Sequence, residues 1–213
     1  MTYDSGPGLQ LAPSASSALD EETARAELYG LLAALYYAPP TPELLAQLRV
    51  ATTEAPAAGG FLEEPWQALV GAARALSDDA VRREYDALFG GVGKPEVYLF
   101  GSHYLSGFLN EKPLAKLRDT LAGLGLARDE TMPETEDHIA YLAEVMRYLI
   151  AGDDVSVANL TRQSEFFSQH VQPWVMPMCD AISQNSKARF YAALSEFTRA
   201  FMSVEVQGFD MLD

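Results

Sequence analysis

ETEDHIAYLAEVMRYL, residues 134–149, is the stretch that decides the fold class of this 213-residue chain. Its apolar residues recur at spacings of three and four, which places them on one face of an α-helix rather than on the alternating positions of a strand. Thr135 is placed to cap this helix, because its hydroxyl can accept a hydrogen bond from a backbone N–H of the first turn. The stretch therefore predicts an amphipathic helix with acids and an imidazole at its start. The apolar stripe comprises Ile139, Leu142, Val145, Met146 and Leu149.

The same helical spacing recurs along most of the chain, and no segment alternates convincingly with period two. Thr41-Pro42 and Ser77 are typical helix starts, and Gly123 or Gly125 is a typical end. These patterns predict an all-α fold, a single domain of roughly eight to ten helices. Residues 1–17, rich in Gly, Pro, Ser and Ala, are expected to form a flexible N-terminal arm, and residues 18–213 the helical domain.

Three further boundaries follow from local signals in the sequence. The aromatic, glycine-interrupted segment 96–110 is expected to be an irregular loop. A helix is expected to start at Asp153 or Asp154 and to reach His170. The last helix is expected to be capped by Asn185 or Ser186 and to run to about Met202.

The charge of the chain limits the classes of partner. Lys and Arg total 15 against 30 Asp and Glu, so the formal net charge is −15. This charge disfavours binding to nucleic acid and anionic lipid and favours a cationic partner. The simpler alternative is that the acidic residues only keep the protein soluble. We therefore predict no nucleic-acid binding and no stable membrane insertion.

Cysteine and histidine are too scarce for a clustered metal site. Cys179 is the single cysteine, which excludes an internal disulfide and favours a buried structural role. His103, His138 and His170 are the three histidines, and none forms a ligand pair of typical spacing. With no secretory signal and no stretch of 18 apolar residues, the sequence predicts a cytoplasmic protein without metal or cofactor.

Gly90-Gly91-Val92-Gly93-Lys94 suggests a phosphate-binding loop, because glycine amides and a lysine can cradle phosphates. The match fails at Pro95, where such loops have Ser or Thr, and a helix rather than a strand is expected before it. A turn that ends a helix is the simpler interpretation. A nucleotide-dependent enzyme that uses the Gly90–Lys94 loop is kept as the alternative function.

Other catalytic motifs are not supported by the sequence. No serine lies in a Gly-x-Ser-x-Gly elbow, so no catalytic residue is assigned and a non-enzymatic role is expected. Taken alone, Asp137 and His138 are most simply capping and first-turn residues, with Asp137 complementing the helix dipole.

Three motifs occur in order along the chain. They are Tyr85-Asp86-Ala87-Leu88-Phe89, Glu134-Thr135-Glu136-Asp137-His138-Ile139, and a block containing Gln163, Phe166-Phe167, His170, Pro173-Trp174 and Phe190-Tyr191. Together they make the chain resemble the TorD/DmsD family of cytoplasmic chaperones for molybdenum-cofactor redox enzymes. Their spacing is compatible with that family over about residues 25–203, although Val92 and Thr135 replace prolines that are frequent there.

The resemblance implies a function and a site. In that family the chaperone holds the twin-arginine signal peptide of its client, or the apo-enzyme itself, until the cofactor is inserted and export can follow. Residue by residue, it implies an apolar wall of Tyr85, Leu88 and Phe89 and a polar part of Asp137 and His138, with Glu134 and Glu136 added for their proximity. A chaperone that grips only the body of the client is the nearest alternative, and both monomer and homodimer remain open.

Overall fold

The computed structural model describes residues 15–53, 60, 62–90, 94–109, 111–128 and 131–211, with side chains from residue 21 onward. These residues form ten α-helices and no strand, which confirms the predicted all-α fold class. The helices are α1 (Ala15–Tyr37), α2 (Pro42–Val50), α3 (Glu63–Ala75), α4 (Asp78–Leu88), α5 (Gly101–Ser106), α6 (Lys112–Gly123), α7 (Ile139–Ala151), α8 (Leu160–His170), α9 (Gln172–Ser183) and α10 (Phe190–Asp210).

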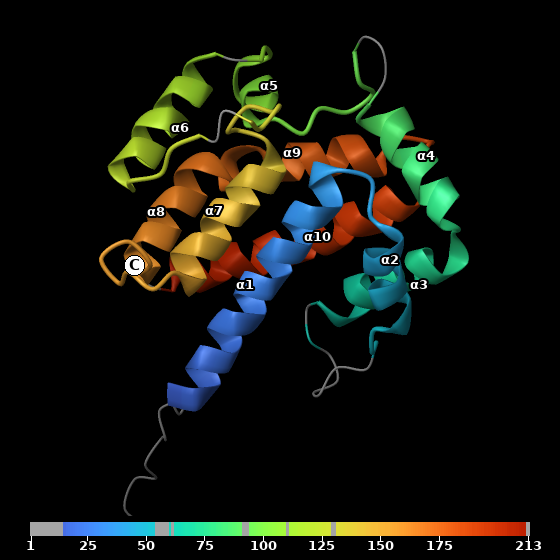
Figure 1. The fold of residues 1–213 in the computed structure, drawn as a ribbon, viewed down its shortest axis with the longest axis horizontal. Helices are drawn as coiled ribbons and strands as arrows, with labels where there is room; N and C mark the ends of the chain where they lie inside the picture. Colours follow the sequence, from blue (N-terminus) through green and yellow to red (C-terminus); the bar gives the residue numbers. More distant parts are fainter. Residues whose placement is uncertain are drawn as a thin grey trace, which may run out of the picture.

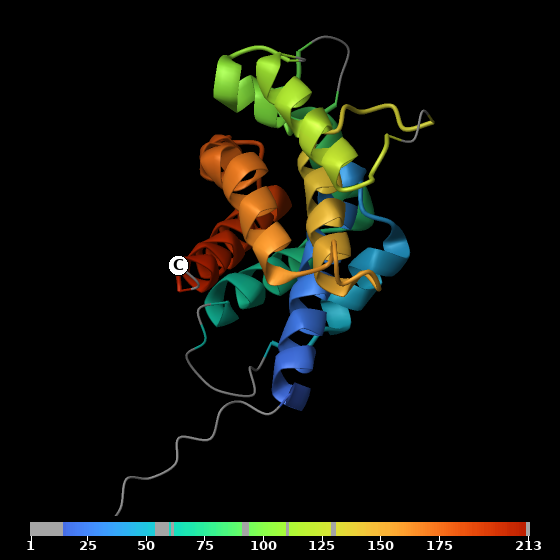
Figure 2. The same ribbon diagram turned by 90° about the vertical axis from the view of Figure 1, so that its left-hand side faces the viewer.

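Two long helices, α1 and α10, form the centre of the molecule together with the helices that pack on them. α1 packs along α7, and α10 packs along α9 and α3. In Figure 1, α5 and α6 lie across one end of this layer, above α7, α8 and α9, while α2 and α3 lie at its side. The view turned by 90° in Figure 2 shows the same two helices (green) at the end of the molecule opposite the start of α1. The segment 131–138 enters α7 at this α5–α6 end.

Large aromatic side chains fill the core between these layers, including the tryptophan of the third motif. Trp174 is buried, and its Nε1 donates a 2.6 Å hydrogen bond to the His170 carbonyl oxygen. A Cβ at Gly101 would lie 2.8 Å from that nitrogen, so α5 approaches the indole only because residue 101 has no side chain. Cys179 is also buried, which confirms the structural role expected for it.

Three of the expected boundaries are wrong. In each case the boundary is set by a packing or hydrogen-bonding partner that the local sequence does not indicate. Segment 96–110 contains α5, which packs on α6 and α9. The carboxylate of Asp154 accepts from the N–H and hydroxyl of Ser156 in a local turn, and α8 starts later, with Asn159 as its N-cap. The last helix starts at Phe190 and continues to Asp210, eight residues beyond the expected end.

The start of α10 is capped from another helix. Glu84 on α4 accepts hydrogen bonds of 2.7, 3.1 and 2.8 Å from the backbone N–H groups of Arg189, Phe190 and Tyr191. The predicted caps Asn185 and Ser186 are therefore not the groups that satisfy this helix end. A carboxylate about one hundred residues away has no local signature, so the sequence could not reveal it.

Other local predictions are confirmed. Thr41 and Ser77 cap α2 and α4 through their hydroxyls, and Gly125, just past α6, has a left-handed φ of 73°. Of the predicted arm, residues 1–14 lie outside the described residues, and residues 15–17 are the first of α1. Among the described helices, none has the length and apolar character that crossing a bilayer requires.

Candidate functional site

The segment that carries the second motif is fixed by backbone pairing. Gly101 N donates to Asp137 O and Ile139 N donates to Leu99 O, both at 2.9 Å, so Phe100 and His138 form an isolated antiparallel bridge. This pairing extends the chain up to residue 138 and delays the start of α7. The prediction that Thr135 caps α7 is therefore wrong, because the helix begins at Ile139.

Asp137 points inward and serves the neighbouring helix. Its Oδ2 accepts a 2.8 Å hydrogen bond from Ser102 N in the first turn of α5, and its Oδ1 accepts one of 2.6 Å from the Thr135 hydroxyl. The residue is only 3% exposed. Asp137 thus caps α5 across the fold and complements the positive end of that helix.

His138 is the N-cap of α7. Its Nδ1 accepts a 3.1 Å hydrogen bond from Ala140 N, and its ring packs edge-on against Phe100 and beside Tyr141. The accepting Nδ1 requires the neutral imidazole, and burial lowers the pKa of His138 from 6.5 to about 4. A helix-capping role is thus what the structure assigns to this side chain.

The buried histidines should make stability depend on pH. Burial, with Lys116 nearby, likewise lowers the pKa of His170 to about 4. As the pH falls, the histidines of the unfolded chain bind protons near pH 6.5, before those of the folded chain do near pH 4. The free energy of unfolding should therefore be full above pH 6.5. Between pH 6.5 and about 4 it should fall by about 1.4 kcal/mol per pH unit for each histidine. Urea unfolding at several pH values measures this slope.

His138→Asn is the informative variant for this slope, because asparagine keeps a capping oxygen but does not titrate. It should flatten the pH dependence even where it lowers stability overall. An unchanged slope in His138→Asn would show that the histidine is not the titrating group.

Glu136 is largely buried beside a cavity, and its carboxylate is already paired. Arg118 on α6 donates from Nε and Nη2 to its two carboxylate oxygens, each at 2.9 Å. Burial raises the pKa of Glu136, but the hydrogen bonds and charge of Arg118 outweigh it and give a net lowering. The carboxylate is therefore ionised at neutral pH.

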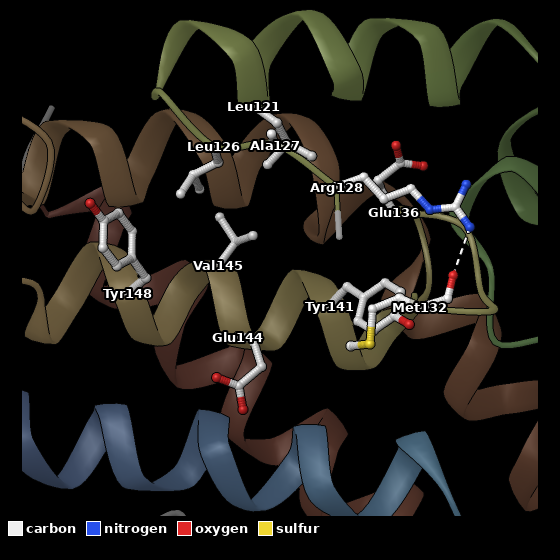
Figure 3. A pocket seen from close by; sticks show the side chains of 10 residues that line it. All are labelled: Leu121, Leu126, Ala127, Arg128, Met132, Glu136, Tyr141, Glu144, Val145 and Tyr148. Carbon is white, nitrogen blue, oxygen red and sulfur yellow. Dashed lines mark hydrogen bonds between the residues drawn. The ribbon is translucent and has the colours of Figure 1, made fainter. Parts of the chain in front are cut away.

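Beside Glu136 lies a cavity of about 340 Å³ between α6 and α7, closed on one side by the segment that follows α6. Figure 3 shows its mainly apolar lining with charged groups at the rim. The Tyr141 hydroxyl in this lining is buried, and within the described residues it makes no hydrogen bond of good geometry. The lining residues are Leu121, Leu126, Ala127, Arg128, Met132, Glu136, Tyr141, Glu144, Val145 and Tyr148.

The first motif lies at the end of α4. Leu88 is wholly buried in the core, whereas Tyr85 and Phe89 are half-buried and pack their rings on Tyr191. The Tyr85 hydroxyl donates to the carbonyl oxygens that end α1, at 3.2 Å to Tyr36 and 2.9 Å to Tyr37. Burial, with the nearby carboxylates of Glu134 and Asp86, raises the pKa of Tyr85 to about 12.

Tyr37 connects the two motifs, although the sequence analysis did not single it out. Its ring lies 5.8 Å from that of Tyr141, and its hydroxyl donates to the Met132 sulfur at 3.8 Å. Motifs that lie about fifty residues apart in sequence thus meet at the end of α1. We call this the tyrosine surface, made of Tyr37, Tyr85, Met132, Glu134 and Tyr141. The sequence marked Tyr37 only by its place two residues before Pro39-Pro40, a pair of prolines that ends a helix.

The structure brings some predicted site residues together at the surface and buries others. Tyr85 and Phe89 remain partly accessible around the tyrosine surface, and the largely buried Glu136 lines the cavity. Leu88, Asp137 and His138 lie beneath them, so a peptide on the surface could not touch their side chains while the protein keeps this structure.

Of the glycine loop, the structure describes the two ends, Gly90 and Lys94. Gly91, Val92 and Gly93 lie outside the described residues, and Lys94 is exposed. In the part of the chain that the structure describes, no three His, Cys, Asp or Glu side chains come together as a metal site.

Comparison with known proteins gives a consistent set of matches. Residues 56–180, more than half of the chain, match the model of the nitrate reductase delta subunit family. A protein named chaperone protein TorD from Vibrio cholerae is 27% identical over 112 residues, 50% of this chain and 51% of that relative. Proteins of the same name from Vibrio parahaemolyticus and Aliivibrio salmonicida are 22% and 25% identical over 114 and 127 residues. The chain spans about half the length of the curated relatives it matches.

Proposed function

The chain belongs to the nitrate reductase delta subunit family, and on this basis we propose that it is a TorD-type maturation chaperone for a molybdopterin-containing oxidoreductase. Family membership confirms the resemblance drawn from the three motifs. The chaperone names of the relatives agree with the predicted non-enzymatic role. In the proposed function the chain acts in the cytoplasm, binds the twin-arginine signal peptide of its client, and delays export until the client is complete.

The observation that carries the proposal is the meeting of aromatic and acidic side chains at the end of α1. A twin-arginine leader has two guanidinium groups followed by an apolar segment. Guanidinium groups bind best to carboxylates that accept paired hydrogen bonds, and Glu134 and Glu136 supply carboxylates here. The apolar segment would lie on the aromatic rings and in the cavity between α6 and α7, whose lining is mainly apolar.

The predicted site residues take two kinds of role in this proposal. Tyr85, Phe89 and Glu136 would contact the leader. Leu88, Asp137 and His138 would act as positioning residues, because they hold α4, α5 and the start of α7 in place beneath it. A buried side chain can support binding only through the residues it positions.

The proposal predicts that a synthetic twin-arginine leader binds with micromolar affinity or better, about −8 kcal/mol or stronger. A leader with both arginines replaced by lysines should bind about tenfold more weakly, because lysine lacks the planar fork of arginine. Titration calorimetry measures both affinities. Absence of heat and of competition for several such leaders would exclude leader binding.

A second comparison separates the leader from the body of the client. Binding of an apo-enzyme should weaken when its leader is deleted. Binding that is unchanged by the deletion would instead favour a chaperone that grips only the client body. Sedimentation of the complex would at the same time report whether the chaperone is a monomer or a homodimer.

A further inference from the structure

The Arg118–Glu136 pair differs in both geometry and burial from the half-exposed Arg147–Glu144 pair at the same cavity. Two nearly equal hydrogen bonds of 2.9 Å join the fork of the guanidinium to both carboxylate oxygens. The carboxylate side is largely buried, with 11% of the Glu136 side chain exposed, whereas 49% of the Arg118 side chain is exposed. The acceptor is thus built into the fold, and the donor lies on the surface.

This asymmetry makes the guanidinium replaceable and the carboxylate fixed. Glu136 belongs to the segment that pairs with residues 99–101, so its backbone is held by the fold. Arg118 reaches it from α6 along a flexible, half-exposed side chain, so water competes for its guanidinium. A second guanidinium group that approaches from solvent could form the same two hydrogen bonds.

The neighbourhood favours an arginine that is followed by apolar residues. Glu136 lines the same cavity as Leu126, Val145 and Tyr148, so a ligand whose guanidinium sits on the carboxylate has apolar wall next to it. The hydroxyl of Tyr141 in that lining makes no hydrogen bond of good geometry within the described residues, and it could donate one to a backbone carbonyl of the ligand.

We propose that Glu136 is a guanidinium subsite, that Arg118 occupies it in the free protein, and that an arginine of a bound leader displaces Arg118 from it. The identification of that arginine rests on the proposed function. Arg118 then competes with the ligand for the Glu136 carboxylate. A ligand can displace it only by forming the same two parallel hydrogen bonds and by adding apolar contacts. A lysine ligand cannot reproduce the fork, so it displaces Arg118 poorly.

The first test measures leader affinity by calorimetry in Arg118→Gln. Removal of the competitor should tighten binding of a twin-arginine leader about two- to fivefold. Arg162→Gln is the matched control, because Arg162 is equally exposed and paired with Glu165 on α8, and it changes the net charge by the same amount. Arg118→Gln should give no gain in a Glu136→Gln background.

Three results would overturn the inference while leader binding itself stands. They are equal tightening in Arg162→Gln, weaker binding by a folded Arg118→Gln protein, and a gain that persists without the Glu136 carboxylate. If Arg118→Gln does not fold, Arg118→Lys keeps the charge but not the fork, and it should tighten binding by a smaller factor.

The second test does not need a leader. Arg118→Ala should melt at a lower temperature than the parent protein, because it leaves a mostly buried carboxylate without a partner. Millimolar methylguanidinium should restore part of that loss, and methylammonium at the same concentration should not. Equal effects of the two cations, or rescue that survives Glu136→Gln, would overturn the subsite. Rescue together with no leader binding would uphold the subsite and reject only the proposed function.

Discussion

Replacing Glu205 with alanine is expected to lower the free energy of unfolding by about 3–5 kcal/mol. Glu205 on α10 is 3% exposed and accepts two 2.8 Å hydrogen bonds from Arg25 on α1 and one of 2.9 Å from the Tyr29 hydroxyl. Alanine would leave the guanidinium of Arg25 with only the amide oxygen of Gln163, at 3.2 Å. A largely buried charge without its counter-ion is among the most costly defects in a core.

Urea unfolding followed by circular dichroism measures this loss. Glu165→Ala is the matched control, because its ion pair with Arg162 is half exposed, and it should cost no more than about 1 kcal/mol. Glu205→Gln should fall between the two, because it keeps the volume and one acceptor. Similar losses in Glu205→Ala and Glu165→Ala would show that the buried network contributes little to stability.

Replacing Asp137 with alanine is expected to destabilise the domain by about 3 kcal/mol. The change removes an acceptor from Ser102 N at 2.8 Å and from the Thr135 hydroxyl at 2.6 Å, and hydrogen bonds to a charged group contribute about 1.5–3 kcal/mol each. It also removes the negative charge at the first turn of α5. Thermal and urea unfolding measure the effect, and leader titration on the same protein measures its consequence for binding.

Asp137→Asn separates a structural role from direct binding. Asparagine keeps an oxygen for Ser102 N and can donate to Thr135, so it should cost about 1 kcal/mol and leave leader affinity nearly unchanged. Full stability combined with a selective loss of binding would show instead that the Asp137 carboxylate contacts the leader.

Much of the helical framework could be predicted because its signals are local. Thr41 and Ser77 cap the helices expected of them, and glycine takes the left-handed conformation after α6. Each of these signals acts within about four residues of its target. α5 was missed because its sequence, GSHYLS, has no helical stripe of its own, and it becomes a helix only where Asp137 caps it and Trp174 supports it.

The sequence predicted which residue types form the candidate site, but it did not predict which of these side chains are exposed. Resemblance to the family identified the two motifs that meet at the tyrosine surface. It could not tell that Asp137 and His138 face inward while Glu136 faces the cavity, because three neighbouring residues in an irregular segment have no fixed period. Tyr37 and Arg118 were missed for a different reason, because their importance comes from partners that are distant in sequence.

The sequence by itself determined that this chain is helical, acidic and a relative of TorD. Periodicity, charge and motif order depend only on the order of residues along the chain. Tertiary structure alone decided which acids cap helices and which one forms an ion pair beside the cavity. Glu84 satisfies α10 across 105 residues, Asp137 satisfies α5 across 35, and Glu136 meets Arg118 across 18. Such pairings depend on how helices pack, and packing is settled by the burial of apolar surface between segments distant in sequence.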